Sequence, residues 1–171
     1  IEYWGGDSWH LLHTIGLNVK VNENNKKDFL IFLNNFQNIL PCPKCRTNFS
    51  KKRSNFIINE KTLTNKSYQK LIYNIHNMVN DSIYKNRISF DQHRELHKPF
   101  NTKKINRFTS LVIDQLNDTP SYQELLECKT YLAYLIKLYP KNLRNKNRIL
   151  NELNTANTKK EIKKWYKKSI D

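Results

Sequence analysis

The sequence predicts an all-α protein. Three observations support this fold class: apolar residues recur at helical spacing, helix breakers are scarce, and no alternation of strands and helices is visible. The chain has 171 residues, of which only 3 are glycine and 5 are proline. With a hydrophobic content of 38%, it is long enough to bury a core. We therefore expect one helical domain, or a domain with a helical appendage.

The first helix is predicted within residues 1–17. It follows a flexible start at Trp4-Gly5-Gly6, and Ser8 fits the N-cap. One face of this helix carries four residues at i, i+3, i+4 and i+7, namely Trp9, Leu12, His13 and Gly16. Two interpretations of this face stay open: core packing with a hydrogen-bonded histidine, or contact with a planar cofactor.

A second, clearly amphipathic helix is predicted over residues 24–39. Its core face contains Phe29, Phe32, Leu33 and Phe36. Leu40-Pro41 ends this helix. The third helix is predicted to run to about Arg53 with Phe49 in the core, and residues 54–64 are expected to form a loop.

Two cysteines stand at the start of the third helix, in the sequence Cys42-Pro43-Lys44-Cys45. Pro43 suits the first helical turn, so Cys42 would be the N-cap and Cys45 would lie in the first turn. A helix N-terminus favours a thiolate, which attacks disulfides and flavins and binds metals. The pair indicates a dithiol/disulfide switch, with half of a zinc site as the open alternative.

The helix predicted over residues 66–85 has two distinct faces. Its apolar face, which we expect in the core, carries Leu71, Ile72, Ile75, Met78 and Ile83. A second stripe, rich in amide and aromatic groups, carries Tyr73, His76, Asn77, Asn80 and Tyr84. Such a stripe suits a neutral heterocycle such as adenine or flavin, and a polar seam between helices is the alternative.

Helices are predicted for the rest of the chain as well. Three capping boxes mark helix starts: Ser89-x-x-Gln92, Ser121-x-x-Glu124 and Thr158-x-x-Glu161. Another helix covers residues 103–117, and the helix from Ser121 ends at Pro140. Cys128 is expected to be a small buried residue of that helix. The apolar faces are Ile105, Phe108, Val112 and Leu116, then Leu125, Cys128, Leu132, Leu135 and Tyr139, then Ile162, Trp165 and Tyr166.

The chain is strongly basic, with 30 Lys and Arg against 15 Asp and Glu and a net charge of +15. These residues are scattered, apart from Lys51-Lys52-Arg53 and the tail, so we favour a solvated surface over nucleic-acid binding. We expect no membrane span, and no signal peptide is visible, although the chain begins at Ile1. Three cysteines are too few for a disulfide-rich secreted scaffold.

Taken in order, the motifs resemble the flavin-linked sulfhydryl oxidases of the Erv/ALR family. The set is Trp4-Gly5-x-x-x-Trp9-x-x-x-His13, then Cys42-x-x-Cys45, then His76-Asn77-x-x-Asn80 with Lys85. The resemblance implies a four-helix bundle with a short fifth helix, wrapped around FAD. We therefore expect an oxidase domain at residues 1–98 and a helical C-terminal extension of unknown role at residues 99–171.

The resemblance also assigns roles to individual residues. Cys42 and Cys45 would be catalytic, Cys42 exchanging with substrate and Cys45 lying beside the isoalloxazine ring. The residues implied to contact FAD are Trp9, His13, Cys45, His76, Asn77, Asn80, Tyr84 and Lys85. Among them, the histidine and asparagines of the fourth helix would hold the adenine end, and Lys85 would lie near the ring or phosphates. Phe90 is a weaker candidate, and no catalytic metal is implied.

The implied reaction is the oxidation of dithiols to protein disulfides. Electrons would pass through the Cys42–Cys45 disulfide and FAD to O2, giving H2O2. The implied partners are dithiol proteins, thioredoxin-like or structural, and a second copy of the chain in a homodimer. The module is similar to those of large DNA viruses, which implies the host cytoplasm, a virus factory or the virion. Otherwise an oxidising compartment such as the mitochondrial intermembrane space or the endoplasmic reticulum is expected.

Three other interpretations stay open. Cys42 and Cys45 could bind zinc with His76 or His13, and the only other candidate ligands are His93 and His97. A basic helical nucleic-acid-binding protein would bind in a salt-dependent way, without using the cysteines. A thioredoxin-like oxidoreductase is the weakest, because no βαβ pattern surrounds the cysteines.

Overall fold

The computed structural model describes residues 4–170, and all regular structure within this range is helical. The helices are α1 (Trp4–Asn18), α2 (Lys26–Phe36), α3 (Pro43–Arg53), α4 (Asn65–Ser82), α5 (Phe90–His97), α6 (Thr102–Asp114), α7 (Tyr122–Lys137), α8 (Lys146–Thr155) and α9 (Lys159–Ile170), with a 3-10 turn η1 (Gln37–Ile39) after α2. The predicted all-α class is confirmed.

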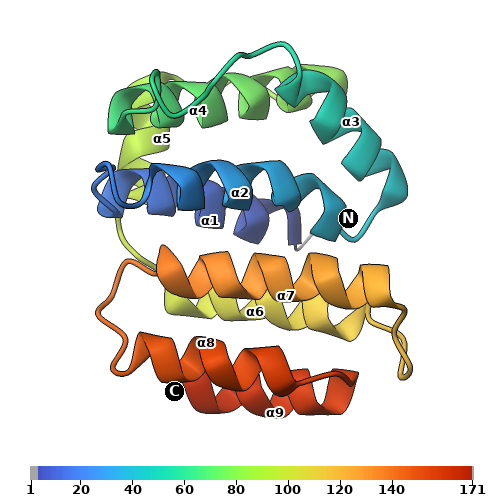
Figure 1. Ribbon diagram of the computed structural model, residues 1–171. Helices are drawn as coiled ribbons and strands as arrows, with labels where there is room; N and C mark the ends of the chain where they lie inside the picture. Colours follow the sequence, from blue (N-terminus) through green and yellow to red (C-terminus); the bar gives the residue numbers. More distant parts are fainter. Residues whose placement is uncertain (1–3, 171) are drawn as a thin grey trace.

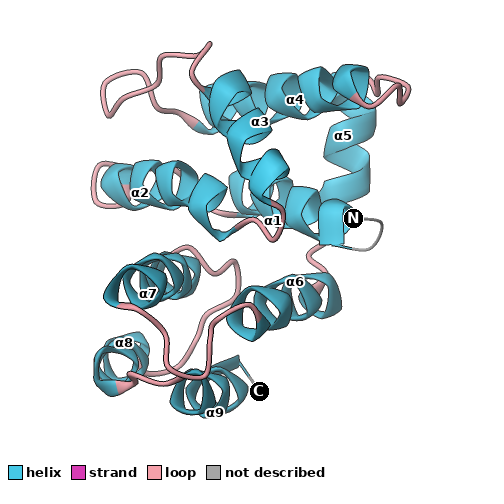
Figure 2. Cartoon of the chain, turned by 90° about the vertical axis from the view of Figure 1, so that its right-hand side faces the viewer, coloured by secondary structure: helices cyan, strands magenta, loops and turns pink. Residues whose placement is uncertain are grey.

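The helices stack in successive layers (Figure 1, Figure 2). Helices α1 and α2 lie in the middle, between α3, α4 and α5 on one side and α6 and α7 on the other, with α8 and α9 beyond them. Helix α1 packs on both α4 and α6, while α2 packs on α7. The predicted boundary at residue 98 falls between α5 and α6, and both regions share the central layer.

One hydrophobic core runs through the layers. Phe36 of α2 stacks against Phe108 of α6 with ring centroids 5.7 Å apart, and Phe32 faces Tyr131 of α7 at 6.1 Å. All four side chains are at most 1% exposed. The C-terminal helices therefore complete the burial of α1 and α2, because the apolar face of α2 points toward them.

Local sequence signals account for most helix starts. The capping boxes at Ser89, Ser121 and Thr158 all form, each with a side-chain oxygen accepting from the backbone N–H three residues on. A further capping box, Thr64 with Ser67, starts α4 and was not predicted. The predicted core faces of α2, α6, α7 and α9 are confirmed, except that Leu125 is only half-buried. Cys128 is buried as predicted.

The structure differs from the sequence predictions in three places, each of which is corrected here. Helix α1 already includes Trp4, so Ser8 lies inside the helix and donates its hydroxyl to the Gly5 carbonyl oxygen instead of capping (2.8 Å). Helix α8 was missed altogether, because its apolar face is short and no capping side chain precedes it. Residues 1–3, part of the first predicted helix, lie outside the described residues.

The third correction concerns the end of α4, which stops at Ser82 rather than at residue 85. Tyr84 adopts a left-handed backbone conformation with φ 57°, and the Lys85 N–H closes back onto the Asn80 carbonyl oxygen at 2.9 Å. This pattern is a Schellman-type helix stop. Ile83, predicted to be in the core, is consequently 49% exposed, and that prediction is wrong.

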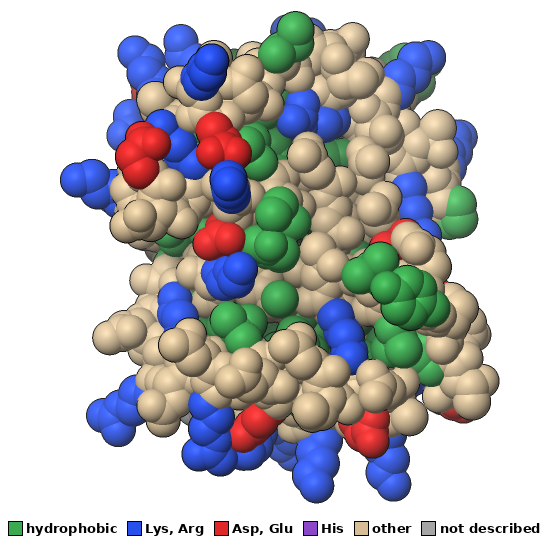
Figure 3. All heavy atoms as spheres, in the orientation of Figure 1, with side chains coloured by type: hydrophobic (Ala, Val, Ile, Leu, Met, Phe, Trp, Pro, Cys, Tyr) green, Lys and Arg blue, Asp and Glu red, His purple; other side chains and the backbone are tan. Residues whose placement is uncertain are grey.

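Lysine and arginine side chains are spread over the face seen in Figure 3 and around its rim, over all the layers. This distribution agrees with the scattered basic residues of the sequence. None of the helices within residues 4–170 combines the length and the apolar character that crossing a bilayer requires.

Candidate active site: a dithiol turn beside a histidine cluster

The start of α3 holds the two cysteines as predicted. Cys42 is the N-cap, with extended backbone (φ −107°, ψ 118°), and Pro43 occupies the first helical position. The Cys42 Sγ accepts a hydrogen bond from the Cys45 backbone N–H at 3.2 Å. The Arg46 Nε donates to the Leu40 carbonyl oxygen at 2.6 Å and so holds the turn in place. Both thiols are free and half-buried.

The two thiols differ in acidity. The pKa of Cys42 is lowered, chiefly by a hydrogen bond from the Cys45 side chain and further by backbone N–H groups of the first turn. The pKa of Cys45 is raised to about 11 by burial, and then by the hydrogen bond to Cys42 and the negative charge there. In the reduced pair, the proton therefore stays on Cys45 and the negative charge resides on Cys42.

Phe49, one turn beyond Cys45 on α3, connects the dithiol to the other helices. Its ring contacts Phe36 at 5.8 Å and Trp9 of α1 at 6.1 Å. Trp9 in turn stacks on His76 of α4, with ring centroids 4.1 Å apart and 7° between the planes. A continuous series of flat side chains thus leads from the cysteine helix to the centre of the bundle.

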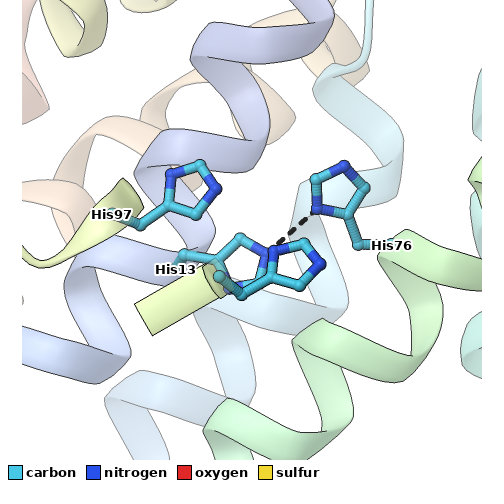
Figure 4. Close-up of side chains that lie close together, drawn as sticks. His13, His76 and His97 are labelled. Atoms are coloured by element: carbon cyan, nitrogen blue, oxygen red, sulfur yellow. Dashed lines mark hydrogen bonds between the residues drawn. The ribbon is translucent and has the colours of Figure 1, made fainter. Parts of the chain in front are cut away.

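That centre is occupied by histidines, and all five histidines of the chain are buried. His13 Nε2 and His76 Nδ1 are hydrogen-bonded at 3.1 Å (Figure 4). The ring of His13 also stacks against His97 and His93, with centroids 4.5 Å and 4.6 Å away. Helices α1, α4 and α5 thus bring these side chains into one cluster.

Burial keeps the cluster uncharged. Desolvation is the largest cause in every case: it lowers the pKa of His76 and His97 to about 3 and that of His10 to about 4. The pKa of His13 also lies well below its usual value, through burial and the neighbouring imidazoles. At neutral pH the cluster therefore presents neutral imidazoles, each with one N–H donor and one acceptor nitrogen.

A hydrogen-bond chain fixes the tautomers of two of these imidazoles. The Asn101 backbone N–H donates to His10 Nε2 at 3.2 Å, so the neutral His10 carries its proton on Nδ1. His10 Nδ1 lies 3.3 Å from His97 Nδ1, which must then accept. His97 consequently carries its own proton on Nε2. Asn101, which directly precedes α6, thus sets the tautomer of His97 on α5 through His10.

His93 stands apart from this network. It is 1% exposed, and neither of its ring nitrogens has a hydrogen-bond partner. Its ring is enclosed by His13, by His76 at 4.7 Å and by Tyr73 in an edge contact at 5.1 Å. A buried polar group without a partner typically costs about 1–3 kcal/mol. A buried imidazole with both ring nitrogens unpartnered is therefore unfavourable unless a further group binds beside it.

The other predicted site residues lie at the end of α4. Asn77 clamps the following loop, because its amide nitrogen donates to the Ile88 carbonyl oxygen at 3.0 Å and its oxygen accepts from the Ile88 N–H at 3.2 Å. Asn80 makes a longer contact with the Asn86 carbonyl oxygen at 3.5 Å. Lys85 is exposed, yet its charge helps to lower the pKa of His76. Both asparagines thus already hold the loop onto the helix.

The structure therefore brings together Trp9, His13 and His76, and ties them to the cysteine helix through Phe49. It leaves Tyr84 98% exposed on the loop, away from the stripe predicted for α4. His10 was not predicted to be part of the site, and His93 and His97 were predicted only as alternative zinc ligands. Their i, i+4 spacing on a short helix was the available signal.

Fold and site together define a helical dithiol protein, with its cysteine pair at a helix N-terminus beside stacked aromatic and imidazole rings. The sequence profile of the Erv1/Alr family matches residues 6–100, and the chain belongs to this family. The chain is also similar to a probable FAD-linked sulfhydryl oxidase of Acanthamoeba polyphaga mimivirus, with 28% identity over 107 residues, covering 60% of this chain and 75% of the relative. No solved structure matches.

Proposed function

We propose that the protein is a FAD-dependent sulfhydryl oxidase that converts dithiols of protein substrates to disulfides and delivers the electrons to O2, giving H2O2. The observation that carries this proposal is the Cys42–Cys45 pair, with its opposite pKa shifts, on a helix that contacts Trp9 through Phe49. Membership of the Erv1/Alr family and the name of the mimivirus relative support the same activity.

The residues around the site suit FAD by the chemistry of their donor set. Trp9, His13 and His76 offer uncharged flat faces for a heterocycle, while Asn80 and Lys85 at the loop supply an amide and a cation for its polar parts. Because Trp9 and His76 stack directly on each other, a ring between them requires the two to separate by about 3.5 Å, one aromatic layer. When bound, FAD would supply a two-electron acceptor that O2 can reoxidise.

The first step is thiol–disulfide exchange at Cys42. A substrate thiolate attacks the Cys42 Sγ of the Cys42–Cys45 disulfide, the S–S bond breaks, and Cys45 leaves as a thiolate. Desolvation is the largest cause of the shifted pKa at Cys45 but not at Cys42, so Cys42 is the sulfur that an incoming protein reaches. The second substrate thiolate then attacks the mixed disulfide, which releases the oxidised substrate and the Cys42 thiolate.

The raised pKa of Cys45 does not oppose this sequence. Two of its causes are the hydrogen bond to Cys42 and the negative charge on Cys42. Both disappear while Cys42 is bonded to the substrate sulfur, so desolvation is then the one remaining cause that raises the pKa of Cys45, and the positive charge of Lys44 still lowers it. The Cys45 thiolate is therefore formed most readily while Cys42 is bonded to the substrate, which is the stage at which Cys45 must pass on its electron pair.

Dithiol protein substrates and a homodimer belong to the same proposal. Much of the surface of α1 and α2 is already covered by α6 and α7, so a homodimer interface would lie on other faces of the bundle. Light scattering on the full chain measures the oligomeric state directly.

The experiment that tests the function is a visible absorption spectrum of the purified full chain, followed by addition of a dithiol in air. We expect a flavin band that survives desalting and peroxide that accumulates with the dithiol. Cys45→Ser should retain the flavin but lose oxidation of the dithiol, and Cys42→Ser should also lose it. Cys128→Ser is the matched control, because Cys128 is buried outside the site. Normal turnover in Cys45→Ser would falsify the mechanism.

A further inference from the structure

Four of the buried histidines meet in an arrangement suited to a metal ion. His13, His76, His93 and His97 each offer a ring nitrogen, and these atoms all lie within 4.8 Å of one another. Figure 4 shows the labelled rings of His13, His76 and His97 converging from separate helices. Imidazole nitrogen is a preferred ligand of Zn²⁺, Cu²⁺ and Ni²⁺. Neither Cys42 nor Cys45 belongs to this group, so the site differs from a cysteine-based zinc site.

The spacing of two of the nitrogens already matches tetrahedral coordination. His13 Nε2 and His76 Nδ1 lie 3.1 Å apart. Two nitrogens bound to one zinc ion at about 2.0–2.1 Å lie about 3.3–3.4 Å apart when the geometry is tetrahedral. This pair shares a hydrogen bond, and a metal ion would replace that bond with little movement of either ring.

His93 supplies the second, independent observation. Both of its nitrogens are buried without a partner, while its ring lies 4.6 Å from that of His13 and 4.7 Å from that of His76. Nothing else in the described part of the chain uses its lone pair. A third ligand is thus present, already desolvated, and not committed to another hydrogen bond.

His97 takes a different part in this cluster. Its Nδ1 accepts from His10, so its Nε2 carries the proton and cannot ligate. An N–H beside a three-histidine site can instead donate to the oxygen of a water molecule in the fourth position. Partners of this kind orient the ligands of a metal and raise affinity.

We propose that this cluster binds a divalent transition-metal ion, with Zn²⁺ as the reference ion, when flavin is absent. His13, His76 and His93 are the ligands, and His97 positions a metal-bound water. The proposal rests on the proposed function in one respect: His13 and His76 would also contact FAD, so metal and flavin exclude each other. Zinc would then regulate flavin loading.

The state of protonation supports the proposal. Burial lowers the pKa of all three ligand histidines, with neighbouring imidazoles contributing at His13 and His76. Metal binding requires neutral imidazole, so protons do not compete near neutral pH. Three charged groups also face the cluster. Lys85, in the loop after α4, acts on His76, and Lys104 of α6 acts on His10 and His97. The Asp7 carboxylate of α1 acts on His10.

The test is titration of the flavin-free full chain with Zn²⁺ by calorimetry, comparing wild type with His93→Leu and His97→Leu. We expect His93→Leu to bind Zn²⁺ more than about a hundredfold more weakly than wild type. Loss of a residue that only hydrogen-bonds to a metal ligand already lowers metal affinity by about 10–100-fold, and His93 is itself a ligand. His97→Leu should fall within that 10–100-fold range. His93→Leu should fold, because leucine removes an unpartnered polar group, and far-UV circular dichroism verifies this. Equal Zn²⁺ affinity in wild type and His93→Leu overturns the proposal.

A second variant separates this proposal from the oxidase function. Asn80→Ala should weaken FAD binding but leave Zn²⁺ affinity unchanged, since Asn80 is not among the ligands. Zn²⁺ should slow FAD uptake in wild type and not in His93→Leu. If wild type binds Zn²⁺ but never FAD, the proposed function fails and the metal site stands. Cobalt(II) spectra of the Cys42→Ser/Cys45→Ser double variant must match those of wild type, and the appearance of thiolate bands in wild type alone overturns the assignment.

Discussion

The imidazole of His76 lies flat against the indole of Trp9, with centroids 4.1 Å apart and 7° between the ring planes. Trp9 also contacts Phe49, which follows Cys45 by one helical turn. A ring that entered beside His76 would displace Trp9. Because Trp9 contacts Phe49, this displacement would reach the helix that carries the dithiol. The stack joins α1, α3 and α4 at the point where the proposed cofactor and the cysteines must meet.

Replacement of His76 by alanine should weaken FAD binding. Loss of one stacking partner of an adenine-like base costs about 1–3 kcal/mol. Equilibrium dialysis or flavin fluorescence titration of His76→Ala measures the change. Lys70→Ala is the matched control, because Lys70 is exposed on the same helix. Full FAD affinity in His76→Ala would show that the adenine-site assignment is wrong.

The reduced protein should be alkylated selectively at Cys42. The pKa of Cys42 is lowered from 9.0 by hydrogen bonds, whereas burial raises that of Cys45 to about 11 and that of Cys128 to about 12. Iodoacetamide labelling at increasing pH, read by peptide mass spectrometry, should therefore modify Cys42 first, with a midpoint below 9.0. Faster labelling of Cys45 than of Cys42 would contradict the asymmetry between the two thiols.

The protein should lose stability steeply in mild acid. Folding lowers the pKa of His76 and His97 to about 3 and of His10 to about 4, from 6.5. Below pH 6.5 the unfolded chain binds more protons than the folded one, so the free energy of unfolding falls as pH decreases toward 3–4. Well above pH 6.5 these groups are neutral in both states and contribute no slope.

Each of these histidines contributes at most about 1.4 kcal/mol per pH unit within that window. Urea unfolding at a series of pH values between 7.5 and 4 measures the slope. His97→Leu should reduce the dependence of the free energy of unfolding on pH by the contribution of one histidine. A midpoint that stays constant from pH 6.5 to 4 would argue against a neutral buried cluster.

Substitution of Gly16 by alanine should destabilise the bundle. A Cβ at Gly16 would lie 2.5 Å from Tyr68 Cδ1 and 2.8 Å from Cε1. Tyr68 is fully buried and cannot turn away, so overpacking of about 1–3 kcal/mol is expected, less the gain in helix propensity. Gly6→Ala, on the same helix with nothing within 4 Å, should instead stabilise by up to about 1 kcal/mol. Thermal melts of both variants, and of Gly16→Ala with Tyr68→Leu, test whether Tyr68 is the cause.

Truncation of Phe108 should destabilise the whole chain rather than the C-terminal helices alone. Phe108 is 0% exposed and stacks on Phe36, and Phe→Ala in such a core costs about 3–5 kcal/mol. Unfolding of Phe108→Ala followed by circular dichroism and by tryptophan fluorescence should show one shifted transition. Lys103→Ala, exposed on the same helix, should leave the midpoint unchanged. A separate, unshifted transition of the N-terminal helices would contradict a shared core.

The neighbouring ion pair of Asp7 and Arg107 joins the same two regions. Asp7 is 4% exposed, and both of its carboxylate oxygens accept from the Arg107 guanidinium, at 2.8 and 2.9 Å. The pair fixes the register of α1 on α6 by a bidentate contact. The sequence does not predict this ion pair, because 100 positions separate the two residues.

The sequence by itself determined the local structure of this protein. Helical periodicity placed the core residues of α2, α6, α7 and α9, and Pro43 after Cys42 was sufficient to predict a cysteine N-cap. These features depend on spacing within one helix turn or on hydrogen bonds across three residues, and both can be read from neighbouring letters. The family resemblance likewise rested on short motifs. The family match over residues 6–100 confirmed the resemblance.

Only the tertiary structure decided what those motifs face. The approach of His10 to His97 spans 87 residues, and that of His13 to His76 spans 63. Such contacts depend on how α1, α4 and α5 pack, which no local pattern specifies. Tyr84 lies off the stripe because α4 ends at Ser82 and Tyr84 itself adopts the left-handed conformation that follows the helix. Residues 99–171 belong to the core because α1 packs on α6 and α2 packs on α7. Local hydrogen bonding is encoded nearby in the chain, whereas burial is a property of the assembled whole.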